Sequence, residues 1–138
     1  MLRFRYMPSD YHPLILILGS ADDLRKLATL LRSFAKDEAE VRLESLDFCA
    51  PGKTKLLLTT RATSQGVRPE ADDGEHFLWI LDAETADEFA FAIDSITSNG
   101  QLSGSEVLEC EQTGEIPVKV SHGEYMDEFL LPSSSLPA

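Results

Sequence analysis

The chain has 138 residues, 43% hydrophobic and 26% charged, which is the composition of one ordinary globular domain. Its 24 Asp and Glu outnumber its 12 Lys and Arg, and the formal charge of -12 argues against nucleic-acid binding because phosphate would be repelled. The apolar run at residues 14–18 is too short for a secretory leader or a membrane span, and the two cysteines form no metal or redox motif, so we expect a cytoplasmic protein without a membrane partner.

The first 40 residues predict two strands and a helix. Residues 2–7 alternate apolar and Arg side chains, which is typical of a half-buried strand. Residues 14–18 are all apolar, as in a central strand that is covered on both faces. Ser20 is a good helix N-cap, and it is followed by two acids and by apolar residues at three- and four-residue spacing. These features predict a helix that ends near Asp37.

The next segment predicts a hairpin. Side-chain parity changes between residues 41–43 and 46–48, which predicts a bulge between them. Pro51 and Gly52 predict a turn, and residues 56–61 predict the strand that follows it.

The second half begins with a long loop. Residues 62–75 contain Gly, Pro and acids without periodicity, and loops of this kind often carry function. Residues 77–81 predict a second central strand, with Trp79 in the core. Asp82 is a good N-cap for a second helix over residues 83–98, which Asn99-Gly100 would end.

The last segments predict a second hairpin and a tail. Residues 107–111 and 118–120 are the strands of that hairpin. Residues 124–131, EYMDEFLL, predict a short amphipathic segment, and residues 132–138 predict a flexible Ser/Pro tail.

Together these elements predict an α+β fold made of two βαββ-like units. The units would form one largely antiparallel sheet of six or seven strands, with two helices packed on one face. The shared element order of residues 14–61 and 77–121 predicts an internal pseudo-repeat within a single domain of residues 1–131. The opposite sheet face would be solvated, would cover a ligand or would pack against a second copy.

The sequence carries no recognisable catalytic signature. Residues 50–54 end like a phosphate-binding loop, but the motif needs a glycine where this chain has Asp47, and a strand follows instead of a helix. We interpret Cys49 and Cys110 as apolar packing residues, and Ser103-Gly104-Ser105 precedes a strand, which does not fit a nucleophile elbow. The three histidines lack metal-ligand spacing. We therefore predict no catalytic residue, no metal and no cofactor.

The charge is distributed unevenly along the chain. Residues 1–68 hold 11 Lys and Arg against 8 acids, whereas residues 69–138 hold only Lys119 against 16 acids. The second predicted helix contains four acids and no Lys or Arg. Such a field attracts cationic partners, although acidic surfaces also serve solubility alone. The residues we expect to bind a partner are Asp72, Asp73, Glu84, Asp87, Glu88 and Asp94.

In small size and strong acidity the chain resembles bacterial immunity and antitoxin-type inhibitors, a resemblance of charge class. That resemblance implies a non-enzymatic interaction module that binds a basic protein partner. The alternative is a small enzyme or ligand-binding protein that uses the open sheet face and loop 62–75, with His76 or His122 beside a cysteine, Glu124 or Asp127. A homodimer, in which cations of the first half meet acids of the second, is a third possibility.

Overall fold

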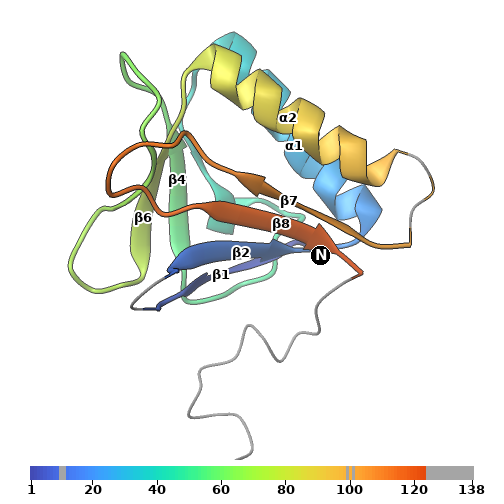
Figure 1. The fold of residues 1–138 in the computed structure, drawn as a ribbon, viewed down its shortest axis with the longest axis horizontal. Coiled ribbons are helices and arrows are strands. Elements are labelled where there is room, and N and C mark those ends of the chain that lie inside the picture. Colours follow the sequence, from blue (N-terminus) through green and yellow to red (C-terminus); the bar gives the residue numbers. More distant parts are fainter. Residues whose placement is uncertain (10–11, 99, 101, 124–138) are drawn as a thin grey trace, which may run out of the picture.

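The computed structural model describes residues 1–9, 12–98, 100 and 102–123. One of its two sheets has the strand order β1-β2-β8-β7 (Figure 1). The central pair β2–β8 is parallel, and both outer pairs are antiparallel. The bounds of these strands are Arg3–Met7 for β1, Leu14–Leu18 for β2, Gly104–Leu108 for β7 and Val118–His122 for β8.

The other sheet has the strand order β3-β4-β6-β5 and the same pairing pattern. Its central pair β4–β6 is parallel, and its outer pairs are antiparallel. The strands are Val41–Arg42 for β3, Lys55–Thr59 for β4, Gly66–Pro69 for β5 and His76–Ile80 for β6.

Two helices carry the chain from one sheet to the other and pack against each other (Figure 1). α1 (Ala21–Asp37) follows β2 and begins with the expected cap, because Ser20 and Asp23 exchange side-chain to backbone hydrogen bonds. α2 (Ala83–Thr97) follows β6 and is capped by Asp82, whose carboxylate accepts from the Thr85 N–H at 2.8 Å. Neither helix of the described ranges is long and apolar enough to cross a membrane.

The two halves of the described chain have the same element order, which is hairpin, helix, hairpin. Each sheet therefore contains one hairpin from each half, and the parallel pair joins the two hairpins. Each structural half begins one strand earlier than the pseudo-repeat of residues 14–61 and 77–121. That pseudo-repeat, as a duplication of sequence, stays a prediction.

One hydrophobic core serves both sheets and both helices. It includes Ile15 and Ile17 of β2, and Leu27 and Leu31 of α1, all fully buried. Trp79 is fully buried as well, as the sequence predicts. Its ring stacks on Phe89 of α2 at a centroid distance of 6.2 Å, and Tyr6 of β1 contacts Phe77 of β6 at 4.8 Å. These two aromatic contacts tie the β3-β4-β6-β5 sheet to α2 and to the other sheet.

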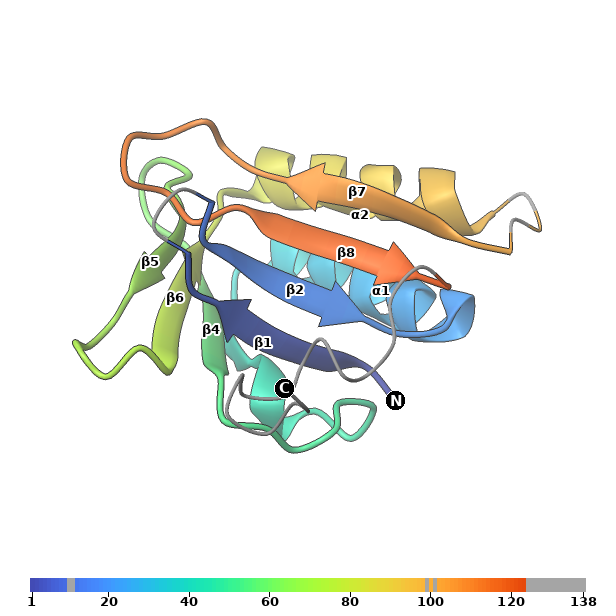
Figure 2. The same ribbon diagram turned by 60° about the horizontal axis from the view of Figure 1, so that its bottom comes forward.

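Both faces of β2 are buried, as the continuous apolar sequence predicts. Ile15 and Ile17 belong to the shared core, and the alternation of side chains along a strand turns Leu16 and Leu18 to the other face of the sheet. The two helices lie behind this sheet in Figure 2. Leu16 is only 4% exposed and Leu18 only 2%. The outer face of this sheet is therefore not simply open to water at β2.

The α+β class and the two helices are confirmed, while the arrangement of the strands differs from the prediction. In the described residues, eight strands form two four-stranded mixed sheets instead of one largely antiparallel sheet. The parity change after residue 43 comes from a 3-10 turn, η1 (Leu43–Ser45), which ends β3 after two residues. A two-residue strand is too short to show a periodic sequence pattern. The two parallel pairs join segments that are far apart in the chain, and a local pattern does not reveal such a pairing.

Two loop predictions are wrong for part of their length. Loop 62–75 contains β5, whose single buried apolar side chain, Val67, lies between Gly66 and Arg68 and gives no alternation to detect. The expected loop Ser103-Gly104-Ser105 includes the start of β7. Residues 124–131 and 132–138 lie outside the described residues.

Candidate functional site

The exposed side of α2 carries an acidic stripe around one aromatic residue. The helix buries Ala86, Phe89, Ala90, Ile93 and Ile96 against the core, so the residues between them face outward. Glu84, Asp87, Glu88, Phe91 and Ser95 are all exposed, and each lies three or four residues from another member of this set. We call these five residues the α2 stripe.

Phe91 lies at the centre of the α2 stripe and is 73% exposed. Glu88 and Asp87 precede it by three and four residues, so they are its neighbours on the helix surface. An aromatic side chain that is exposed to water does not stabilise the free protein through burial. When a partner buries it, such a side chain can contribute much of the affinity of the interface. The charge pattern of the second half points to this helix face but does not distinguish Phe91 from the buried Phe89.

Asp94 has a different environment from the stripe. Its carboxylate forms an ion pair with the guanidinium of Arg32 on α1. The sequence correctly shows no cation within α2, but the neighbouring helix supplies one. Asp94 therefore joins the two helices at the margin of the stripe.

Asp72 and Asp73 lie at the other end of β6 from the start of α2 (Figure 1). A five-residue strand is about 17 Å long, so these two acids are well separated from Glu84. The Asp73 carboxylate accepts hydrogen bonds from the N–H groups of Glu75 and His76, and it lies 2.6 Å from His76 Nδ1. These hydrogen bonds lower the pKa of Asp73. The six acids expected at one site thus fall into two groups, and Asp73 shapes its own turn.

A polar cleft of about 370 Å³ adjoins the acidic stripe at the start of α2. Four carboxylates line it, from Asp82, Glu88, Glu109 and Glu111, and no Lys or Arg does. Thr63 and Ser64 also line it. Of these residues, only Glu88 was expected at the site from the sequence. Glu109 and Glu111 were not expected there, because their position depends on the pairing of β7 with β8 and on the turn after β7. We call this site the acidic cleft.

Within the part of the chain that the structure describes, the cysteines and histidines do not come together at one site. Burial raises the pKa of Cys49 to about 11 and that of Cys110 to about 12, so both thiols stay protonated at neutral pH. His122 is buried and donates a hydrogen bond from Nε2 to the Ile96 carbonyl at 2.6 Å. His76 contacts Asp73, as described above. Among the described residues no three His, Cys, Asp or Glu side chains are placed to share a metal ion.

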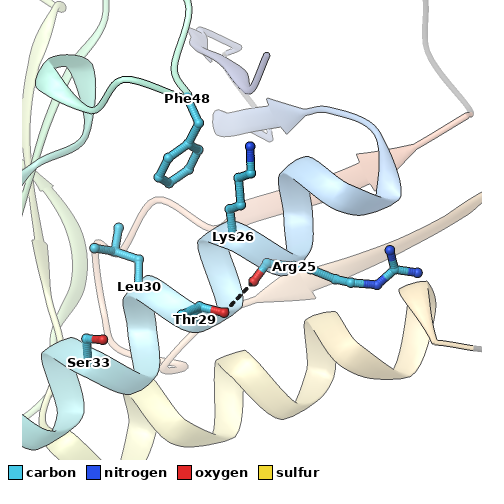
Figure 3. A pocket seen from close by; sticks show the side chains of 6 residues that line it. All are labelled: Arg25, Lys26, Thr29, Leu30, Ser33 and Phe48. Carbon is cyan, nitrogen blue, oxygen red and sulfur yellow. Dashed lines mark hydrogen bonds between the residues drawn. The ribbon is translucent and has the colours of Figure 1, made fainter.

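A second groove, of about 410 Å³, lies over α1 and has the opposite charge (Figure 3). Phe48 reaches from the loop before β4 toward the side of α1 that carries Leu30 and Lys26 (Figure 3). Arg25 and Ser33 lie on the same helix, and the Thr29 hydroxyl donates to the Arg25 carbonyl at 3.0 Å. The groove is thus apolar between Leu30 and Phe48, with the cation Lys26 at its rim.

Comparisons with protein-family models, with curated proteins and with solved structures found no match to this chain.

Proposed function

We propose that this protein is a non-enzymatic interaction module that binds a basic protein partner through the α2 stripe. One observation carries the proposal, namely the 73% exposure of Phe91 among Glu84, Asp87 and Glu88. Carboxylates steer a cationic partner toward the helix and raise the rate of association. The aromatic ring then supplies the contact that slows dissociation.

Within this reading, the finer proposal is an immunity-type inhibitor of a basic toxin in the cytoplasm. Its support is the charge class of the chain and the acidic cleft beside the stripe, which adds the carboxylates of Asp82, Glu109 and Glu111 for a cationic loop or side chain. Both cysteines are free thiols, which fits a reducing compartment.

A pull-down from the native cell tests the main proposal. The wild-type chain should capture a basic protein, and Asp87→Lys/Glu88→Lys should slow association by tenfold or more because it removes the steering charge. Phe91→Ala should speed dissociation by about 30-fold, as truncation of a central aromatic contact does. Surface plasmon resonance with the captured protein measures both rates.

A matched control separates the stripe from net charge. Asp47→Lys/Glu70→Lys changes the charge by the same amount at two exposed acids outside the stripe, and it should leave association within about threefold of wild type. A captured partner that is acidic, or one whose binding survives Asp87→Lys/Glu88→Lys, contradicts the proposal. Inhibition of a captured nuclease by the wild-type chain would support the immunity-type reading.

The second candidate is self-association, and the groove over α1 favours it. Its cation Lys26 and the apolar pair Leu30 and Phe48 complement the α2 stripe, which is acidic with Phe91 at its centre. Because α1 and α2 lie side by side, a two-fold dimer would place each helix of one copy against the opposite helix of the other.

The remaining alternative is a small enzyme or ligand-binding protein on the open sheet face and loop 62–75. Its support is that Thr63 and Ser64 of that loop line the acidic cleft. The contacts of His76 with Asp73 and of His122 with the Ile96 carbonyl favour the interaction module over this alternative, since neither histidine meets a cysteine. Glu124 and Asp127, the other expected partners of these histidines, lie outside the described residues.

A further inference from the structure

The outer strands of the two sheets differ in how their edges are covered. Beside β1, the Leu2 N–H donates to the Phe48 carbonyl at 2.7 Å, and the Leu2 carbonyl accepts from the Ala50 N–H at 2.8 Å. Beside β5, the Val67 carbonyl accepts from the Ile116 N–H at 3.0 Å. β3 is an edge of only two residues. β7 has five residues, and among the described residues no backbone hydrogen bond covers its outer side.

β8 determines which backbone groups of β7 remain free. The Ile15 N–H donates to the Pro117 carbonyl at 3.0 Å, and the Gly19 N–H donates to the Ser121 carbonyl at 3.3 Å. The odd-numbered positions along β8 therefore turn their backbone groups toward β2. Because these directions alternate along a strand, the even-numbered residues of β8 turn theirs toward β7.

Ser105 and Val107 have backbone groups that point away from the sheet. The even-numbered residues of β8 pair with Gly104, Glu106 and Leu108, which use their N–H and C=O groups in the ladder. The alternation leaves the N–H and C=O groups of Ser105 and Val107 on the outer edge, where no other described residue bonds to them. Val107 is also 47% exposed. An extended segment could form a further ladder with these groups.

α2 runs alongside this edge (Figure 2). A Cβ at Gly104 would lie 3.1 Å from the Cβ of Ile96, near the end of the helix. Past the other end of β7, Glu109 lines the acidic cleft together with Glu88. A strand spacing is about 4.8 Å and a helix is about 10 Å across, so a strand added to β7 lies within reach of side chains of α2.

The side chains along the edge are acidic on one face and uncharged on the other. Leu108 is buried in the core beneath α2, and Glu106 has the same parity, so its carboxylate lies on the side of the helix that carries Glu88. On the other face the edge presents Ser105 and Val107. A complementary strand therefore alternates cationic side chains, which face the helix, with apolar side chains beside Val107.

We propose that the basic partner adds an extended, cationic strand to β7. The inference rests on the proposed function for the charge of the partner, and it adds a backbone ladder that fixes how the partner is bound. A second copy of this chain is a poorer occupant. Two β7 strands paired across a two-fold axis would bring Glu106, Glu109 and the acids of α2 close to the same residues of the other copy, in chains of formal charge -12.

Amide hydrogen exchange on the 138-residue chain tests the edge directly, with a soluble peptide in which lysine and valine alternate as the probe. At a peptide concentration about ten times its dissociation constant, exchange at the Ser105 and Val107 N–H groups should slow by about tenfold. The same peptide with N-methylated amides keeps the charge but cannot form the ladder, so it should give no protection. A peptide with glutamate in place of lysine should bind at least about tenfold more weakly.

Three results of this experiment would overturn the proposal. They are protection by the N-methylated peptide, no protection by the lysine peptide, and equal binding of the glutamate peptide. Protection that appears without peptide and increases with protein concentration would assign the edge to a second copy, and it would overturn the proposal as well.

A pair of variants at Val107 extends the test to the captured partner. Val107→Pro removes the outward N–H and leaves the ladder to β8, since proline is tolerated where an edge strand turns its N–H outward. It should weaken binding of the peptide and of the partner by about tenfold or more, whereas Val107→Thr keeps the N–H and should stay within about threefold of wild type. Urea denaturation checks that both variants fold, and if Val107→Pro does not, the exchange result on the wild-type chain decides.

The same measurements separate this inference from the proposed function. If Val107→Pro has no effect while Asp87→Lys/Glu88→Lys slows association, the strand addition is wrong and the α2 stripe stands. If the charge reversal has no effect on the partner, the proposed function fails, and the peptide results still decide whether β7 accepts a cationic strand.

Discussion

Gly66 cannot be replaced without cost, because its backbone conformation and its neighbouring atoms both disfavour a side chain. It adopts φ 72°, and a Cβ would lie 2.0 Å from Glu115 Oε2. The same carboxylate accepts hydrogen bonds from the N–H groups of Cys110 and Gln112, so it is held in place. Gly66→Ala should therefore lower the free energy of unfolding by about 2–4 kcal/mol, as measured by urea denaturation.

Gly74 provides the matched control for this prediction. Its φ of 70° is almost the same, but a Cβ there meets no atom within 4 Å. Gly74→Ala should cost only the left-handed conformation, about 1 kcal/mol. Equal costs at the two positions would mean that the Glu115 contact contributes nothing.

Asp82 links the stability of α2 to pH. The hydrogen bond from the Thr85 N–H lowers the pKa of this carboxyl. The ionised carboxylate lies at the N-terminus of α2, where the helix dipole favours a negative charge. A carboxyl with a lowered pKa in the folded state contributes stability above its ordinary pKa of about 3.9, and this contribution is lost as the pH falls through the folded pKa.

Substitutions at Asp82 test both parts of this statement. Asp82→Ala should lower the free energy of unfolding by about 1 kcal/mol at pH 7. Asp82→Asn keeps the cap without the titration, so any advantage of wild type over this variant at pH 7 should shrink at pH 3. Chemical denaturation at the two pH values measures the difference. A wild-type advantage that grows on acidification would show the opposite linkage.

At the level of elements, the sequence predicts what is set locally. Both helices begin at the expected residues because Ser20 and Asp82 sit directly before apolar residues at helical spacing. β2 is predictable because five consecutive apolar residues need cover on both faces. β5 and the 3-10 turn η1 are not predictable from local sequence. β5 forms by pairing with β6, and η1 ends the preceding strand after two residues.

The residues of the candidate site also differ in how far the sequence predicts them. The acids of the α2 stripe follow from helical spacing, which is a local property. Glu109 and Glu111 reach the acidic cleft through the turn that follows β7, and Arg32 reaches Asp94 through the packing of two helices. Such contacts depend on tertiary structure, and a single sequence carries no signal for them.

At the scale of the whole molecule, opposite charges on α1 and α2 make self-association dependent on salt. Sedimentation velocity at about 20 mM and 500 mM NaCl should show a larger average mass at low salt, because the Debye length falls from roughly 20 Å to about 4 Å. Lys26→Glu should abolish the low-salt species by placing a carboxylate opposite the α2 stripe. A mass of 15.3 kDa under both conditions would eliminate the dimer and leave a separate basic partner for the stripe.

The parallel pair β2–β8 has a consequence for synthesis on the ribosome. β2 ends at Leu18, and its neighbour β8 begins only at Val118, so the strand with apolar side chains on both faces leaves the ribosome about 100 residues before its partner. At ~5–20 residues per second this interval lasts roughly 5–20 s. During that time Leu14–Leu18 can pair with β1 alone, and the nascent chain presents an unpaired apolar strand edge. Such an edge is a binding site for chaperones that act on nascent chains, so the yield of folded protein should depend on the rate of translation.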